Sequence, residues 1–165
     1  MNVLSLILSG LAILLAIYAI FRKKEQPADQ QSGEKFNSIP LRLQAYERLV
    51  LLTERIALPN LISRLHQPNI SAHEMKIILA ENIKQEFEHN MTQQLYVSPL
   101  TWDAVRNLKE QNILIINQVS NTLAPTASGN DLNKKILEVI MSQQGGMLHE
   151  MVAEALNFEA KKLMT

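Results

Sequence analysis

The feature that most constrains this chain is an apolar run near its N-terminus. From Val3 to Phe21 there are 19 residues without a charged side chain. A helix of this length is about 28 Å long, close to the roughly 30 Å hydrocarbon core of a bilayer. A helix in a soluble core seldom stays apolar on every face over five turns. The run therefore predicts a transmembrane helix, with the lipid bilayer contacted through residues 3–21.

A basic cluster after this run favours an anchor over a cleaved signal peptide. Arg22, Lys23 and Lys24 follow it directly, whereas no basic side chain precedes it and no small-x-small cleavage site follows. A signal peptide has the opposite arrangement. The positive-inside rule places the cluster in the cytoplasm and the N-terminus outside. We therefore expect residues 1–24 to be a single-pass anchor in the inner (cytoplasmic) membrane and residues 39–165 to be a cytoplasmic domain.

Small residues recur along one face of the predicted anchor, at spacings of 4, 3, 4 and 3. Small side chains let two membrane helices approach closely, and serine hydroxyls can bond across the interface. The stripe is either a self-association face, which would make the protein a homo-oligomer, or the ordinary composition of a membrane helix. Its members are Ser5, Ser9, Ala12, Ala16 and Ala19.

The rest of the chain has the composition of a linker followed by a helical domain. Residues 25–38 are polar and contain Gln, Ser, Gly and Pro, which predicts a flexible linker that spans about 20 Å as a coil. From Ile39 onward the apolar residues recur with a helical period, and no strand-like alternation exceeds four residues. These patterns predict an all-α fold, in which a soluble bundle of about five to six helices follows the anchor and linker.

Caps and breaks divide this domain into helices. We expect helices over 39–56 and 60–65, from 71 onward, over 99–123, over 132–140 and over 148–163, with extended residues at 95–97 and a loop over 124–130. Ser71 and Glu74 form a capping-box pattern, and Ser98 before Pro99 is a second start signal. Gly145-Gly146 kinks or ends the fifth helix. The last helix is marked by Leu148, Met151, Val152, Ala155, Leu156 and Leu163.

Composition excludes several classes of function. The chain has 165 residues and no Cys, so it has no disulfide framework, thiolate nucleophile or Cys-ligated zinc. It holds 16 basic and 16 acidic side chains, and the three basic residues beside the anchor leave 13 against 16 after residue 24. A mildly acidic domain is not expected to bind nucleic acid.

Several blocks of sequence form a recognisable set: Leu43–Leu49, Glu54–Ile56, Glu86–Asn90, Gln93–Ser98 and Trp102. Together they resemble an uncharacterised family of small, single-pass, membrane-anchored helical proteins from Bacteroidota. It covers the anchor and most of residues 39–165. The family is a domain of unknown function, so the resemblance implies the topology and no reaction.

Glu86 and His89 are the one pair with metal-type spacing, because residues at i and i+3 share a helix face. A di-iron bundle needs a second such pair and two more glutamates, and no second Glu-x-x-His is present. We therefore predict no catalytic residue, metal site or cofactor. A small helical metal-binding protein or enzyme centred on Glu86 and His89 remains the alternative.

Two other groups of polar and aromatic residues have predicted roles. The first is a structural polar network of inter-helix ion pairs and hydrogen bonds. The second either packs at the edge of the bundle or forms an exposed partner surface. The network comprises Glu47, Arg48, Glu54, Arg55, Glu86 and His89, and the surface comprises Gln93, Gln94, Tyr96, Trp102 and Arg106. The sequence as a whole predicts a non-enzymatic, membrane-tethered adaptor or scaffold that binds another protein.

Overall fold

The computed structural model describes residues 38–142 and 148–164 of the chain. The predicted anchor, its stripe of small residues, residues 25–37 of the predicted linker and the Gly145-Gly146 junction lie outside these residues. In the part described, no helix combines the length and apolar character that crossing a membrane requires.

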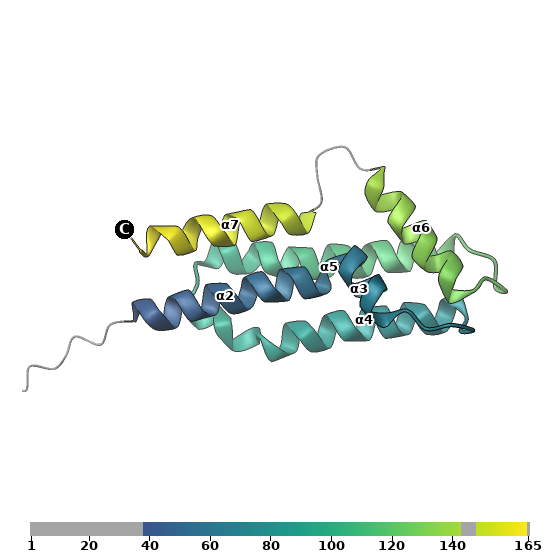
Figure 1. The fold of residues 1–165 in the computed structure, drawn as a ribbon, viewed down its shortest axis with the longest axis horizontal. Coiled ribbons are helices and arrows are strands. Elements are labelled where there is room, and N and C mark those ends of the chain that lie inside the picture. Colours follow the sequence, from purple (N-terminus) through teal and green to yellow (C-terminus); the bar gives the residue numbers. More distant parts are fainter. Residues whose placement is uncertain (1–37, 143–147, 165) are drawn as a thin grey trace, which may run out of the picture. The chain divides into compact units, whose positions relative to one another are not determined.

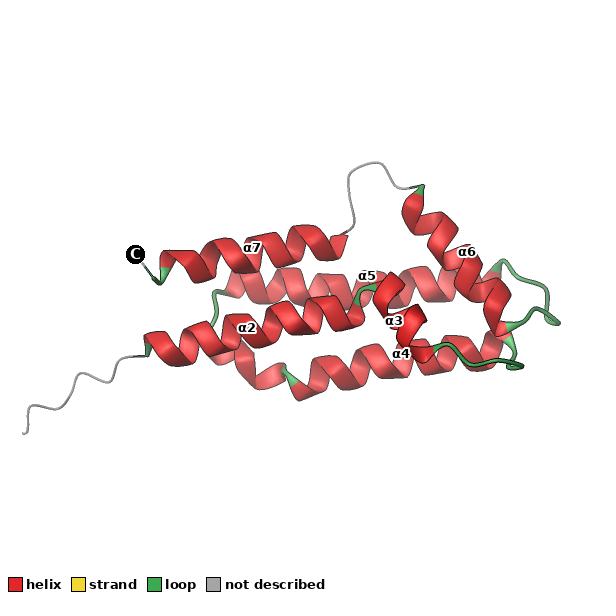
Figure 2. Cartoon of the chain, in the orientation of Figure 1, coloured by secondary structure: helices red, strands yellow, loops and turns green. Residues whose placement is uncertain are grey.

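The described residues form an all-α fold, as the sequence predicted, with six α-helices, one 3-10 helix and no strand (Figures 1 and 2). Residues 38–165 make up one compact unit. The helices are α2 (Ile39–Ile56), α3 (Leu58–Leu65), α4 (Ala72–His89), η1 (Met91–Leu95), α5 (Pro99–Asn121), α6 (Gly129–Met141) and α7 (Leu148–Lys162).

Four long helices, α2, α4, α5 and α7, make up the body of the bundle. Helix α2 packs against α7, α4 and α5, while α5 also packs against α4 and α7. Helix α6 packs on α4, α5 and α3 at one end (Figure 1). At the opposite end α2 begins, η1 connects α4 to α5, and α7 ends (Figure 1).

Most of the predicted apolar positions lie in the core, but α7 departs from the prediction. Val152 and Leu156 are buried, and Leu163 packs on the core. Leu148, Met151 and Ala155 are exposed, because α7 buries only the face that contains Val152 and Leu156. The larger buried side chains of the other helices are Tyr46, Leu49, Leu52, Ile56, Leu61, Met75, Leu79, Ile83, Leu108, Ile116, Leu132 and Ile136.

The starts of α4 and α6 are capped in the same way and joined to each other. The Ser71 side chain accepts from the Glu74 amide, and the Glu74 carboxylate accepts from the Ser71 amide, which confirms the predicted capping box. A second capping box joins Ser128 and Asp131. Between them, the Gly129 amide donates to the Ile70 carbonyl at 2.8 Å, and the Ala72 amide donates to the Ala127 carbonyl at 2.9 Å.

Several boundaries differ from the prediction. Helix α6 begins at Gly129, inside the predicted loop over 124–130, because its capping box organises that segment. Helix α3 begins at Leu58 rather than at residue 60, since Pro59 fits a first-turn position. The predicted extended residues 95–97 were wrong at Leu95, which ends the 3-10 helix η1, and at Tyr96, whose amide donates to the Gln93 carbonyl.

Candidate functional site

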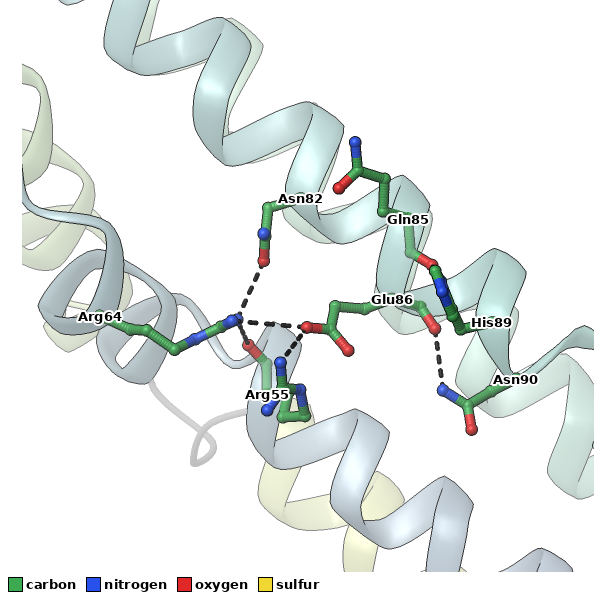
Figure 3. A network of polar contacts seen from close by, with 7 residues as sticks. All are labelled: Arg55, Arg64, Asn82, Gln85, Glu86, His89 and Asn90. Atoms are coloured by element: carbon green, nitrogen blue, oxygen red, sulfur yellow. Dashed lines mark hydrogen bonds and ion pairs between the residues drawn. The ribbon is translucent and has the colours of Figure 1, made fainter.

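The most connected polar cluster surrounds Glu86 on α4 (Figure 3). Arg55 of α2 forms a close ion pair with the Glu86 carboxylate, and Arg64 of α3 approaches the same oxygen at 3.4 Å. Arg64 also donates to the Asn82 side chain at 2.9 Å and to the Arg55 carbonyl at 3.1 Å. This cluster therefore fixes α4 against the corner where α2 meets α3.

The charges in this cluster hold Glu86 in its ionised form. The hydrogen bond from Arg55 lowers the pKa of Glu86 and outweighs the opposing effect of partial burial, and the charges of Arg55 and Arg64 add to it. The same bond raises the pKa of Arg55. A carboxylate stabilised by two guanidinium groups is a poor general acid or base at neutral pH. The cluster is therefore suited to holding α2, α3 and α4 together rather than to proton transfer.

His89 does not join Glu86 in a shared site. Its Nδ1 atom lies 2.8 Å from the Gln85 carbonyl of the same helix, while Glu86 is directed toward the two arginines (Figure 3). Among the described side chains, no group of three His, Cys, Asp or Glu is placed to hold a metal ion. The cationic surroundings of Glu86 further disfavour a bound cation, so this geometry does not support the metal-binding alternative.

The remaining members of the predicted polar network lie apart from this cluster. The Glu54 carboxylate accepts from the Asn60 side chain at 3.2 Å across the break between α2 and α3. Glu47 and Arg48 are exposed, and neither side chain has a hydrogen bond or ion pair within residues 38–142 and 148–164. Arg64 and Asn82, which sequence reasoning missed, carry no local pattern that marks them as partners of Glu86.

A second polar cluster, also missed by sequence reasoning, connects α7 to the rest of the bundle. The Glu159 carboxylate accepts from the Tyr46 hydroxyl of α2 at 2.7 Å and from the Ser98 hydroxyl at 2.8 Å. Ser98 also caps α5 by accepting from the Thr101 amide at 3.1 Å, as the sequence predicted for this helix start. One carboxylate thus holds the C-terminal half of α7 against α2 and the start of α5.

Burial and hydrogen bonding act against each other on Glu159. Burial alone would raise the pKa of Glu159, but hydrogen bonds from Tyr46, Thr101 and Ser98 outweigh it and lower the pKa below its ordinary value. Burial, followed by the bond to Glu159, raises the pKa of Tyr46. Because the carboxylate is already stabilised, Glu159 is a weak base and is not suited to activating the Ser98 hydroxyl.

The residues of the predicted partner surface divide into two groups. Gln93 is buried, and Trp102 is half-buried with its ring packed against that of Phe87, at a centroid distance of 5.1 Å and an interplanar angle of 33°. Gln94, Tyr96 and Arg106 are exposed, and Arg106 pairs with Asp103 at 2.7 Å. Trp102 therefore packs against the core, while the side chains of the other three residues are exposed to solvent.

Apolar side chains that the sequence did not single out extend this surface. Leu95 is 76% exposed and Leu100 is 77% exposed, with Met91 and Tyr96 exposed beside them along the chain. We call Met91, Leu95, Tyr96 and Leu100 the η1–α5 corner. Two of the largest exposed fractions among apolar side chains of the described residues therefore lie within ten residues of sequence.

An unusual buried amide lies beside an open groove between α3 and α6. Within the described residues, neither the nitrogen nor the oxygen of the Asn133 side chain has a hydrogen-bond partner, although the residue is only 3% exposed. The groove, about 510 Å³ in volume, is bordered by Ile62, Ser63, His66 and Lys134 among others. Both polar atoms of the Asn133 amide are buried, so they do not offer a contact to a ligand in the groove. Because they are buried without hydrogen bonds, they destabilise the folded state.

Comparison with known proteins gives a family and no activity. No curated protein and no solved structure matches the chain. A model of a family of unknown function, DUF7935, matches residues 1–163, which is nearly the whole sequence. The chain, with its helical bundle, therefore belongs to the DUF7935 family of unknown function.

Proposed function

We propose that this protein is a membrane-anchored helical adaptor that binds a partner protein at the η1–α5 corner and catalyses no reaction of its own. The anchor is the apolar run at residues 3–21, and the basic cluster at 22–24 orients it with the helical domain in the cytoplasm. The observation that carries the proposal is the exposure of Leu95 and Leu100, each more than three-quarters accessible to solvent.

Exposed leucines on a preformed surface favour binding over a purely structural role. Covering a fully exposed leucine contributes about 1.5–3 kcal/mol, so a partner that covers both gains substantially. The corner is held in place by the bundle, since Arg42 of α2 donates to the Tyr96 carbonyl at 3.3 Å. Two further contacts join α5 to α4: the Lys109 ammonium lies 4.6 Å from the centre of the Phe87 ring, and the Trp102 ring packs against the same ring. A surface that is already ordered loses little conformational entropy on binding.

The position of the corner indicates where the partner lies. The corner is at the end of the bundle where α2 begins, which is where the predicted linker joins the domain (Figure 1). A linker of about 14 residues spans about 20 Å as a coil. We therefore expect the partner to be a membrane protein, or a protein held at the cytoplasmic face, that presents an apolar segment.

Site-specific photo-crosslinking of the full chain in its native membrane tests this proposal. A photoreactive phenylalanine analogue replaces Leu95 or Leu100, and the matched control is Ile77, an apolar side chain of α4 that is 48% exposed. We expect one protein, identified by mass spectrometry, to be captured from both corner positions and not from Ile77.

A substitution then distinguishes specific binding at the corner from non-specific binding. The double variant Leu95→Ser/Leu100→Ser, made without the photoreactive residue, should reduce recovery of the identified protein by co-purification at least about tenfold, since loss of about 1.4 kcal/mol already weakens binding tenfold. Ile77→Ser should leave recovery unchanged. Equal capture from Ile77, or unchanged recovery with the double variant, would contradict the proposal.

A further inference from the structure

The end of the bundle at which α2 begins carries much of its exposed apolar surface. This end, which we call the linker end, comprises the start of α2, η1, the start of α5 and the end of α7 (Figure 1). Seven of the fourteen large apolar side chains that are exposed among the described residues belong to these segments. They are Ile39, Leu41, Met91, Leu95, Tyr96, Leu100 and Met164.

The opposite end of the bundle differs in this respect. Its two loops are residues 66–71 between α3 and α4 and residues 122–128 between α5 and α6 (Figure 1). Neither loop contains any of the large apolar side chains that are exposed. The bundle therefore has one polar end and one apolar end.

Contacts between the segments of the linker end bring them to one level along the bundle. Helices α2 and α7 run antiparallel, and Tyr46 of α2 donates to Glu159 of α7 at 2.7 Å (Figure 1). One helical turn closer to the linker end, Arg42 of α2 donates to the Tyr96 carbonyl at 3.3 Å. Met164 follows Glu159 by five residues in the same direction. The start of α2, the end of η1 and the end of α7 therefore contribute to one surface.

The chain that precedes α2 indicates what covers this surface. The predicted anchor at residues 3–21 and the predicted linker lead directly into the linker end. A linker of about 14 residues spans about 20 Å as a coil, so the bilayer surface is within reach of this end. Tethering also raises the effective concentration of the bilayer at the linker end, so a contact that is weak in free solution becomes populated.

The charged side chains of the linker end are compatible with lipid headgroups. Lys161 and Lys162 are exposed in the last turn of α7, and a lysine stem can lie along apolar surface while its ammonium group reaches a phosphate. Of the acids at this end, Asp103 is ion-paired and Glu159 is hydrogen-bonded within the bundle, whereas Glu88 is exposed. Because acids and bases are mixed here, we expect the contact to depend on apolar burial more than on anionic lipid.

We propose that the linker end of the bundle rests in the interfacial layer of the bilayer, with Ile39, Leu41 and Met164 in contact with lipid. The inference rests on the anchor of the proposed function and adds a second membrane contact, made by the helical domain. The η1–α5 corner then lies at the membrane surface. A membrane protein can cover the corner there while lipid covers the other three side chains.

The absence of cysteine allows a nitroxide spin label to be attached at one chosen residue. Full-length Leu41→Cys and Met164→Cys chains are labelled, reconstituted alone into vesicles of phosphatidylethanolamine and phosphatidylglycerol, and measured by power-saturation EPR. Oxygen concentrates in lipid, whereas a water-soluble nickel complex is excluded from it. We expect a higher ratio of oxygen to nickel collisions at both labels than at the matched control, Met141→Cys, which is 85% exposed on α6.

A substitution then tests whether the apolar side chains make the contact. In the chain labelled at Met164→Cys, the double variant Ile39→Ser/Leu41→Ser should lower the collision ratio toward the value at the Met141→Cys control, because less apolar surface enters the bilayer. Ile77→Ser, at an exposed apolar position of α4 outside the linker end, should leave the ratio unchanged. A ratio that the double variant leaves unchanged overturns the proposal.

The labels also distinguish lipid from the other possible surroundings. A collision ratio equal to that of the control would place the linker end in water, and few collisions with either reagent would mean that protein, such as a second copy of the chain, covers it. Either result overturns the proposal. Flotation of the labelled chain with the vesicles tests the anchor separately, and a chain that does not float contradicts the anchor as well. Since the vesicles contain no other protein, the EPR result does not bear on capture of a partner at the corner.

Discussion

Two buried asparagines have opposite effects on the energy of the same core. Asn112 is 5% exposed and donates to the Ile56 carbonyl at 2.8 Å, where α2 ends and leaves that carbonyl without a helical partner. Asn133 is 3% exposed, and neither polar atom of its side chain has a partner in the part of the chain that the structure describes. A buried polar group without a partner costs about 1–3 kcal/mol, whereas a paired one stabilises the fold.

This contrast predicts changes of opposite sign for the same substitution. We expect Asn133→Leu to raise the free energy of unfolding by about 1 kcal/mol and Asn112→Leu to lower it by about 2 kcal/mol. Urea unfolding of the full chain in detergent measures both values. Trp102 is the only tryptophan and packs on Phe87, so its fluorescence reports on the bundle. Destabilisation by Asn133→Leu would show that its amide has a favourable partner.

The Glu159 cluster predicts a dependence of stability on pH. The pKa of Glu159 is lowered from its ordinary value of 4.5 in the folded chain, so the folded state favours the carboxylate. Its contribution to stability is therefore complete above that value and is lost as the pH falls through the lower, folded pKa. Glu159→Gln should destabilise the bundle by about 1–2 kcal/mol at pH 7 and by less at pH 3.

Denaturant unfolding of the Glu159→Gln variant and the original chain at both pH values provides this comparison. Tyr46→Phe, which removes one donor and retains the ring, should show a smaller loss of stability at pH 7. The acid dependence of Glu86 is common to all of these chains and cancels in the differences. A Glu159→Gln loss that stays constant from pH 7 to pH 3 would rule out the carboxylate as the source.

Individual contacts differ in how well the sequence could predict them. Arg55 and Glu86 were both expected in a polar network, because charged residues beside predicted apolar stripes can form ion pairs between packed helices. Tyr46 and Glu159 are separated by 113 residues, and no local pattern relates them. Such contacts follow from the packing of whole helices, which is why the second cluster was found only in the structure.

At the scale of single helices, a capping-box pattern in the sequence is sufficient to locate the start of a helix. The pattern at Ser71 and Glu74 correctly placed the start of α4. The same logic applied to Ser128 and Asp131 would have placed the start of α6, but the Pro and Gly nearby indicated a loop instead. The 3-10 helix η1 could not be predicted in this way, because its short i to i+3 bonds leave no apolar period.

The start of α6 predicts a position where alanine is worse than glycine. A Cβ atom on Gly129 would lie 3.0 Å from Ile70 Cγ1 and 3.1 Å from Met75 Cβ. Gly129→Ala should therefore lower the free energy of unfolding by about 1–2 kcal/mol, because overpacking outweighs the helix preference of alanine. Asn130→Ala, at the exposed next position, serves as the control and should change stability little. Equal stability of both variants would mean that the neighbours of Gly129 move at low cost.

At the scale of the whole molecule, the topology proposed for the anchor can be tested by chemical labelling. Gln118 is exposed on α5, and the chain contains no cysteine. We expect Gln118→Cys to be protected from a membrane-impermeant maleimide in intact spheroplasts and to be labelled after lysis, because the proposed topology, based on the basic cluster at residues 22–24, places the domain in the cytoplasm. Labelling before lysis would reverse the proposed orientation.

The joined starts of α4 and α6 have a consequence for hydrogen exchange. The first amides of a helix normally lack a carbonyl partner and exchange quickly with solvent. Ala72 and Gly129 are exceptions, since each donates to the loop of the other helix. Their amides should exchange more slowly than those of His73 and Asn130, the next residue in each helix, as NMR can measure. The two loops would then open as one cooperative unit, although they are more than fifty residues apart in the chain.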